Sequence, residues 1–126
     1  MARELTVDRI VAAPPEVVWS LVAHTRRWPD WGPSVRAVDP ADSEVTPGLT
    51  GRVRSVAGPW LAFRVTTVEP GRAWAWSVAG VRATGHRVDP HPDGCRVTFT
   101  VPWWAAPYRL VCAAALRRIE RLATTG

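Results

Sequence analysis

Three side chains in this sequence have the chemistry for proton transfer at a predicted internal site: His86, Tyr108 and Arg54. Histidine exchanges protons near neutral pH, so His86 is the candidate general acid/base or hydrogen-bond partner for a ligand carbonyl. Tyr108 would present its hydroxyl to the same space, although a core or rim position is the favoured alternative. For His86 the alternative is a core histidine satisfied by a neighbour such as Tyr108 or Thr84.

Familiar catalytic and cofactor motifs are absent from the sequence. It contains no GxSxG elbow, no HExxH pair and no glycine-rich phosphate loop. We therefore expect no metal and no cofactor, and any catalysis would rest on shape plus one or two acid/base groups. Cys95 and Cys112 lack a CxxC or Cys/His spacing, so we expect them to be reduced and buried.

Length and charge restrict the class of protein. The chain has 126 residues and a net charge of +5, and all sixteen basic residues are arginine. We expect one domain, residues 1–126. The arginines form no basic run, which argues against nucleic-acid binding and leaves an acidic protein partner or an anionic ligand. No apolar run approaches the roughly 20 residues of a membrane span, and no signal peptide is visible, so a cytoplasmic protein is expected.

The elements that would position these side chains centre on residues 61–101, where alternating apolar residues predict four antiparallel strands. A two-residue turn at Pro70-Gly71 would pair Glu69 with Arg72. A loop at residues 91–94 would pair Pro90 with Cys95. One face of this sheet then collects Phe63, Val65, Thr67, Trp74, Trp76, Val78, Thr84, His86, Val88, Val97, Phe99 and Val101.

Two turns decide which side chains face inward. A three-residue turn at Gly80 places His86 beside Trp76 on the apolar face, whereas a two-residue turn would place Trp76 opposite Gly85 and His86 in solvent. We favour the three-residue turn because it keeps the faces consistent. At Gly58-Pro59, a two-residue turn would point Arg54 inward, and a three-residue turn would point Ser55 inward.

The flanking segments complete the pattern. Residues 4–11 read as a strand with Arg9 on its apolar side, where it needs a partner. A helix should run from Pro14-Pro15 to Ala23, and Thr25 should cap a short second helix. Strands follow at residues 34–38 and 51–57, and apolar residues at helical spacing predict a final helix over residues 107–123 that covers the sheet.

The eight tryptophans suggest an aromatic-lined pocket between sheet and helix, with core packing as the competing interpretation. Trp103 and Trp104 precede the last helix and suit either the core or a partner surface. The expected ligand-binding residues are Trp28, Phe63, Val65, Trp74, Trp76, Thr84, Val97, Phe99 and Cys112.

Residues 7–31, with V-x-R-x-V-A-A-P-P-E-V-V-W-S-L-V followed by R-R-W-P-D-W, resemble the SRPBCC or START-like superfamily, closest to its polyketide cyclase/dehydratase group. V-E-P-G-R, A-T-G-H-R-V and D-G-C-R-V-T-F support the resemblance. It implies an α+β helix-grip fold, in which a curved antiparallel sheet of about seven strands wraps around a long C-terminal helix and a hydrophobic cavity lies between them. In aromatase/cyclases an arginine and a serine on the strands of Arg54 and Ser55 line the pocket. His24 departs from the usual aspartate, so Thr25 would have to cap the second helix.

Three functions follow from these features. The first is binding of a small aromatic or polyketide-like ligand, with cyclisation or dehydration if the protein is an enzyme; an acidic acyl carrier protein would then be a partner. The second is a non-catalytic lipid or quinone carrier. The third is a partner-binding module that uses Trp103-Trp104 and the arginine-rich exterior.

Overall fold

The computed structural model describes residues 4–125 and contains seven strands, three α-helices and two 3-10 helices. In chain order these elements are β1 (Glu4–Val11), α1 (Pro15–Ala23), η1 (Thr25–Arg27), α2 (Trp28–Trp31), β2 (Val35–Asp39), β3 (Thr50–Ser55), β4 (Trp60–Glu69), β5 (Ala73–Val78), β6 (Val81–His91), β7 (Gly94–Pro102), η2 (Trp103–Tyr108) and α3 (Arg109–Thr124). No helix among these residues is both long enough and apolar enough to span a bilayer.

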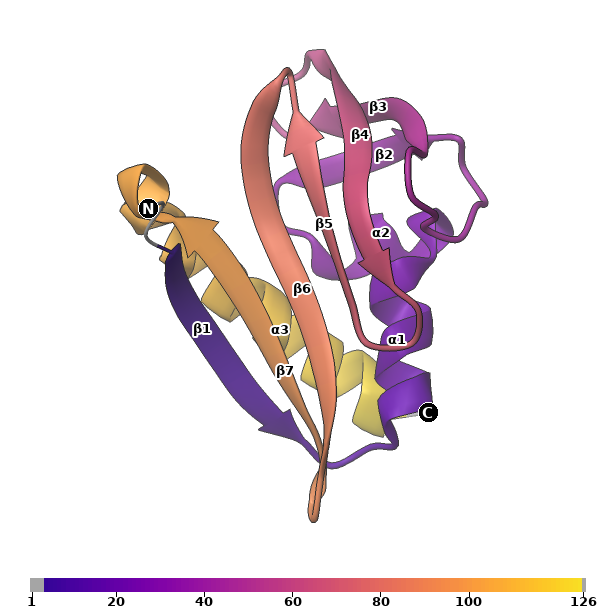
Figure 1. Cartoon of the computed structure of the whole chain (residues 1–126), viewed down its shortest axis with the longest axis vertical. Coiled ribbons are helices and arrows are strands. Elements are labelled where there is room, and N and C mark those ends of the chain that lie inside the picture. Colours follow the sequence, from indigo (N-terminus) through magenta and orange to yellow (C-terminus); the bar gives the residue numbers. More distant parts are fainter. Residues whose placement is uncertain (1–3, 126) are drawn as a thin grey trace.

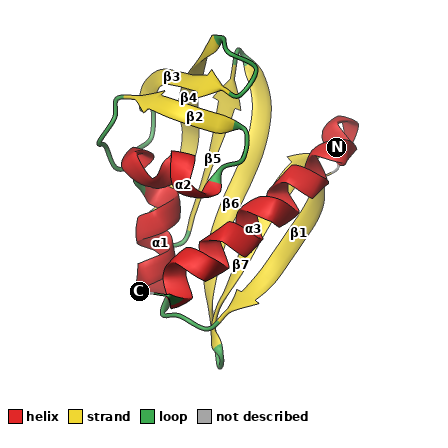
Figure 2. Cartoon of the chain, turned by 180° about the vertical axis from the view of Figure 1, so that it is seen from behind, coloured by secondary structure: helices red, strands yellow, loops and turns green. Residues whose placement is uncertain are grey.

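The strands form one antiparallel sheet in the order β1-β7-β6-β5-β4-β3-β2. Six strands follow the chain as a meander, and β1 joins the free edge of β7 (Figure 1). The long helix α3 crosses one face of this sheet, and α1 and α2 lie beside it (Figure 2). The predicted α+β helix-grip architecture is therefore confirmed. Arg9 also has its expected partner, because its guanidinium lies 2.8 Å from the Glu120 carboxylate on α3.

The helix bounds differ slightly from the prediction. Helix α1 begins at Pro15 with Glu16 in its first turn and ends at Ala23, as expected. The prediction that Thr25 caps the second helix is wrong, because its hydroxyl instead accepts a hydrogen bond from the Ser43 backbone N–H at 2.9 Å. The last helix, expected from residue 107, begins at Arg109 because residues 103–108 form the tighter helix η2.

The β4–β5 hairpin combines a correct turn with one wrong pairing. Gly71 has a φ of +74° and the Arg72 N–H bonds to the Glu69 carbonyl, as expected for Pro-Gly at a turn centre. However, Glu69 pairs with Ala73 rather than Arg72. A bulge at Thr66 absorbs the extra residue, so the predicted pairs Phe63–Val78 and Val65–Trp76 are present. Thr67, expected to face inward, is exposed.

The β5–β6 hairpin keeps His86 on the buried face through a combination of turn and bulge that the sequence did not predict. Ala79 and Gly80 both have positive φ and form a two-residue turn that pairs Val78 with Val81, so the predicted three-residue turn is wrong. A bulge at residues 83–84 then restores the parity. His86 therefore pairs with Trp74, not Trp76, and still points into the protein.

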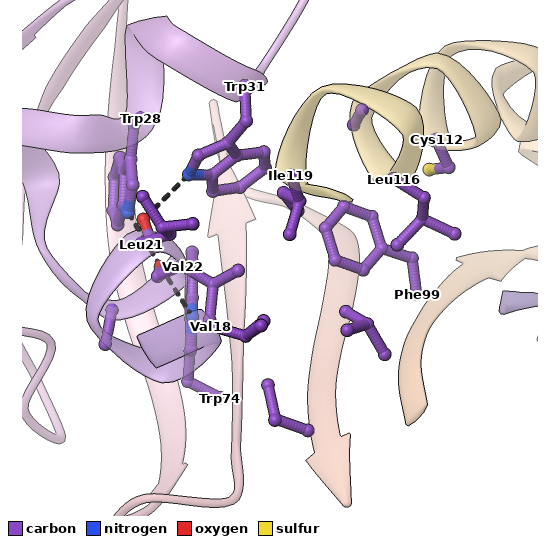
Figure 3. Close-up of a cluster of buried hydrophobic side chains, with 14 of the residues drawn as sticks. Val18, Leu21, Val22, Trp28, Trp31, Trp74, Phe99, Cys112, Leu116 and Ile119 are labelled. Carbon is purple, nitrogen blue, oxygen red and sulfur yellow. Dashed lines mark hydrogen bonds between the residues drawn. The ribbon is translucent and has the colours of Figure 1, made fainter. Parts of the chain in front are cut away.

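The core is built around the carboxyl-terminal end of α1, where backbone carbonyls lack helical partners. The indole N–H groups of Trp28 and Trp74 both donate to the Val22 carbonyl, at 2.9 and 3.0 Å, and that of Trp31 donates to the Leu21 carbonyl at 2.8 Å (Figure 3). Trp28 and Trp74 stack with their ring planes 8° apart. These tryptophans are therefore mainly structural, because they satisfy the helix end and fill the core.

Candidate functional site

An apolar hollow lies between one end of the sheet, formed by strands β2 to β7, and η2. It has a volume of about 320 Å³. Sheet residues supply one wall and η2 supplies the other. The lining is mostly aliphatic and aromatic: Ser34, Val35, Val53, Ser55, Leu61, Trp76, Val78, Val81, Arg82, Ala83, Thr84, Val101, Pro102, Trp104, Ala105 and Tyr108. We call this hollow the main cavity.

A second, much smaller hollow of about 40 Å³ lies deeper, between the tryptophan cluster and α3. It is lined by Trp28, Trp74, His86, Phe99 and Cys112, among others, and it shares Trp76, Thr84 and Tyr108 with the main cavity. Of the predicted ligand-binding residues, only Trp76 and Thr84 reach the main cavity. Phe63, Val65 and Val97 line neither hollow and belong to the core.

Tyr108 and Ser34 stand where the two hollows meet. Their hydroxyl oxygens are 2.6 Å apart, so a hydrogen bond joins η2 to the loop before β2. Both residues line both hollows. Burial is the main cause of a raised pKa for Tyr108, which keeps the phenol protonated and able to donate a hydrogen bond. Of the three residues that the sequence suggested for proton transfer, Tyr108 is the one that lines the main cavity.

His86 forms a polar chain whose directions follow from its partners. The Trp74 carbonyl can only accept, so His86 Nδ1, 3.3 Å away, carries the proton. His86 Nε2 is therefore an acceptor for the Thr84 hydroxyl at 2.9 Å. The Thr84 oxygen in turn accepts from the Trp76 indole N–H at 3.0 Å. Both ring nitrogens of His86 are thus engaged by protein groups.

Burial also determines the charge of His86. The residue is only 4% exposed, and its ring stacks on Trp74 with 4.0 Å between centroids. Desolvation lowers the pKa of His86 to about 3, opposed by its hydrogen bond to the Trp74 backbone. At neutral pH the imidazole is therefore uncharged. This arrangement matches the alternative in which Thr84 satisfies a core histidine.

Arg54 is not at the cavity. It pairs with Trp60 across β3–β4, is exposed, and donates to the Gly58 carbonyl at 3.4 Å. Both predicted turn lengths at Gly58-Pro59 are wrong, because five residues separate the last pair, Arg54 and Trp60. Ser55 nevertheless lines the cavity and Arg54 does not, as expected for the three-residue turn. The cationic side chain that does reach the cavity is Arg82, on β6, which the sequence did not single out.

The sequence also missed the wall formed by η2. Trp104 and Ala105 of η2 line the main cavity, although Trp103-Trp104 was assigned only to the core or to a partner surface. Pro102 at the end of β7 and Val81 at the start of β6 also line it. A clue was available in the close spacing of Trp104, Ala105 and Tyr108 ahead of an amphipathic helix. Cys95 and Cys112 are buried free thiols, as expected. Across residues 4–125 no three His, Cys, Asp or Glu side chains cluster as metal ligands would.

The main cavity lies against η2, and only the small hollow touches α3, so the cavity expected between the sheet and the last helix is displaced toward the start of that helix. A curved antiparallel sheet gripping one long helix defines a START-like helix-grip protein. The chain belongs to the family described as polyketide cyclase / dehydrase and lipid transport, whose model matches residues 2–124. No curated protein matches the sequence.

Solved structures share the fold at low sequence identity. Protein MLL2253 from Mesorhizobium loti superposes with a TM-score of 0.77 at 16% identity, over 95% of this chain and 96% of that chain. Protein Ms6760 from Mycobacterium smegmatis gives 0.73 at 21% identity, over 97% and 91% of the two chains. DynU16, a putative protein in the dynemicin biosynthetic locus, gives 0.72 at 22% identity, over 97% of this chain and 48% of that chain.

Proposed function

We propose that this protein binds a small hydrophobic ligand, aromatic or polyketide-like, non-covalently in the main cavity. The observation that carries the proposal is the apolar lining of that cavity, with only a few polar side chains that could orient a ligand. Its volume of about 320 Å³ is near the lower end of ligand-site volumes, which suits a compact ligand of two or three rings. The engaged, uncharged His86 favours a carrier that binds without proton transfer.

Filling the main cavity is expected to abolish this binding. Val78 lines the cavity near the β5–β6 turn, so Val78→Trp should occupy the space and weaken binding of the neutral dye phenylnaphthylamine by at least about 10-fold. Titration by dye fluorescence measures the effect.

The same exchange at an exposed loop position is the matched control. Val56 is exposed and does not line the cavity, so Val56→Trp should bind the dye as the parent does. Equal dye affinity in Val78→Trp and the parent would rule out the main cavity as the binding site. Failure of any apolar probe to bind the parent would favour the partner-binding module instead.

A second function, ring closure or dehydration, is favoured by the position of the Tyr108–Ser34 pair at the cavity. We propose that the Tyr108 hydroxyl, held protonated, donates a hydrogen bond to a ligand carbonyl oxygen and so polarises the carbonyl carbon that an aldol-type ring closure attacks. An acidic acyl carrier protein would present such a substrate, and the arginine-rich exterior, including Arg82 at the cavity, supports that partner.

A matched pair of ligands tests the carbonyl contact. Tyr108→Phe should weaken binding of acetylnaphthalene about five-fold, the effect of one hydrogen bond, and leave ethylnaphthalene unchanged. The infrared carbonyl stretch of bound acetylnaphthalene should also move to higher frequency in the variant, because the hydrogen bond that weakens the C=O bond is lost. Equal losses for both ligands would mean that Tyr108 only packs against the ligand.

A further inference from the structure

The surface formed by η2 and the outer side of α3 combines exposed apolar and basic side chains. Trp103 is 58% exposed, Trp104 53% and Leu110 77%, and all three lie at the amino-terminal end of the α3 region. Farther along α3, Leu110, Ala114, Arg117 and Arg121 recur at i, i+4, i+7 and i+11 and form one outward stripe. The buried residues of α3 lie on the opposite side of the helix. We call this the η2–α3 surface.

The charge of this surface is uncompensated. Within residues 4–125, none of the ion pairs involves Arg109, Arg117, Arg118 or Arg121. The single acidic residue of α3, Glu120, pairs with Arg9 of β1. The four arginines of α3 therefore form no ion pair within the described residues, and the one carboxylate beside them is bound to Arg9. Figure 2 shows α3 in front of the sheet with no other helix or strand over it.

We propose that the η2–α3 surface binds an anionic lipid bilayer. Tryptophan favours the bilayer interface, because its ring is apolar and its N–H is polar, and a protruding leucine inserts among the acyl chains. Arginines pair with lipid phosphates. The apolar face of α3 is buried in the protein, so the membrane contact would be made by the exposed apolar residues at the start of the helix region and by the outward arginines that follow them. The proposal does not depend on the identity of the cavity ligand.

The position of the main cavity fits this docking mode. Trp104 is both exposed and part of the cavity lining, and Ala105 and Tyr108 of the same segment also line the cavity. A bilayer that contacts η2 would therefore lie next to the cavity wall. An apolar ligand could then pass between the bilayer and the protein with little exposure to water, because the two apolar surfaces adjoin.

Vesicle binding tests the proposal with the whole protein. Sedimentation with vesicles of phosphatidylglycerol and phosphatidylcholine should show binding that weakens as salt is added, and vesicles of phosphatidylcholine alone should bind far less. The triple variant Arg109→Gln, Arg117→Gln, Arg121→Gln should bind the anionic vesicles roughly 30-fold more weakly or worse. The double variant Trp103→Ser, Leu110→Ser should lose about 10-fold or more because its apolar anchors are gone.

Matched control variants distinguish an effect of the η2–α3 surface from an effect of the protein's net charge. Arg36, Arg54 and Arg64 lie on strands of the sheet, are exposed and form no ion pair within the described residues. Their exchange to glutamine changes the net charge equally and should preserve vesicle binding. Val56→Ser controls for loss of an exposed apolar residue. Far-ultraviolet circular dichroism and dye binding confirm that each variant is folded.

Three results would overturn the proposal. The first is no binding of the parent protein to anionic vesicles. The second is an equal loss of vesicle binding in the two triple arginine variants, which would mean that only the net charge of the protein matters. The third is binding of an acidic acyl carrier protein that requires the η2–α3 residues while vesicles are ignored. Dye binding by the parent distinguishes each of these from a failure of the cavity proposal, because the dye is titrated without lipid.

Discussion

Replacing Trp74 with alanine is expected to lower the free energy of unfolding by about 4 kcal/mol, the usual cost of deleting a fully buried tryptophan. Trp74 is 2% exposed, stacks on Trp28 and on the His86 ring, and donates to the Val22 carbonyl at 3.0 Å. The exchange would leave a cavity and remove both stacking contacts. Urea unfolding followed by circular dichroism measures the loss, and the melting temperature should fall by on the order of 10 °C.

Two further variants make this result specific. Trp74→Phe keeps an aromatic ring between Trp28 and His86, and the Val22 carbonyl still accepts from the Trp28 indole at 2.9 Å. We therefore expect it to cost only about 1–2 kcal/mol. Trp103→Ala, at an exposed position, should change stability by less than about 0.5 kcal/mol. If Trp74→Ala were no worse than Trp103→Ala, the tryptophan cluster would not be the core of this fold.

Acid should destabilise the parent protein steeply because of His86. The pKa of this residue is about 3 in the folded protein and 6.5 when exposed, so the unfolded chain binds a proton that the folded protein does not. Its full contribution is therefore present above pH 6.5, and stability is lost as pH falls from 6.5 toward 3, at up to about 1.4 kcal/mol per pH unit.

Comparison with His86→Gln isolates this effect from the carboxylates, which titrate in both proteins. At pH 7.5 the variant should be the less stable protein, because it loses the ring stacked on Trp74. By pH 4.5 the parent should have lost about 2–3 kcal/mol more than the variant. His91→Gln, at the end of β6, is the matched control and should retain the steep acid dependence of the parent. If the stability of the parent and of His86→Gln changed with pH in parallel, protonation of the imidazole would not destabilise the folded protein.

The hydrogen bonds of His86 explain why this residue lies close to the main cavity without being able to contact a ligand there. Thr84 is both a cavity-lining residue and the hydrogen-bond partner of His86 Nε2. The imidazole therefore stands one residue behind the cavity wall. This position orients Thr84 and, through it, the Trp76 indole, and it removes His86 from direct contact with a ligand in the main cavity.

The sequence alone determined the fold class and the buried face of the sheet. Period-two alternation over residues 61–101 places Phe63, Val65, Val97 and Phe99 inward, and each of them is buried. Successive side chains along a strand point to opposite faces of the sheet. A shift by one residue would therefore expose every buried apolar side chain of the strand to water, which the hydrophobic effect disfavours. The helix α3 was predictable for the same reason, from the spacing of its apolar residues.

Only the tertiary structure decided the register and the location of the cavity. A two-residue turn at Gly80 should have turned His86 outward, but the bulge at residues 83–84 reverses that effect. The bulge at Thr66 similarly offsets the turn at Pro70-Gly71, which is one residue longer than predicted. A bulge depends on how the twisted strands pack against the helices, which local sequence does not encode. The cavity is the volume that packed side chains leave unfilled. The sequence shows that Trp28, Trp74 and Phe99 are apolar, but only their neighbours in the structure decide whether each one fills the core or lines the cavity.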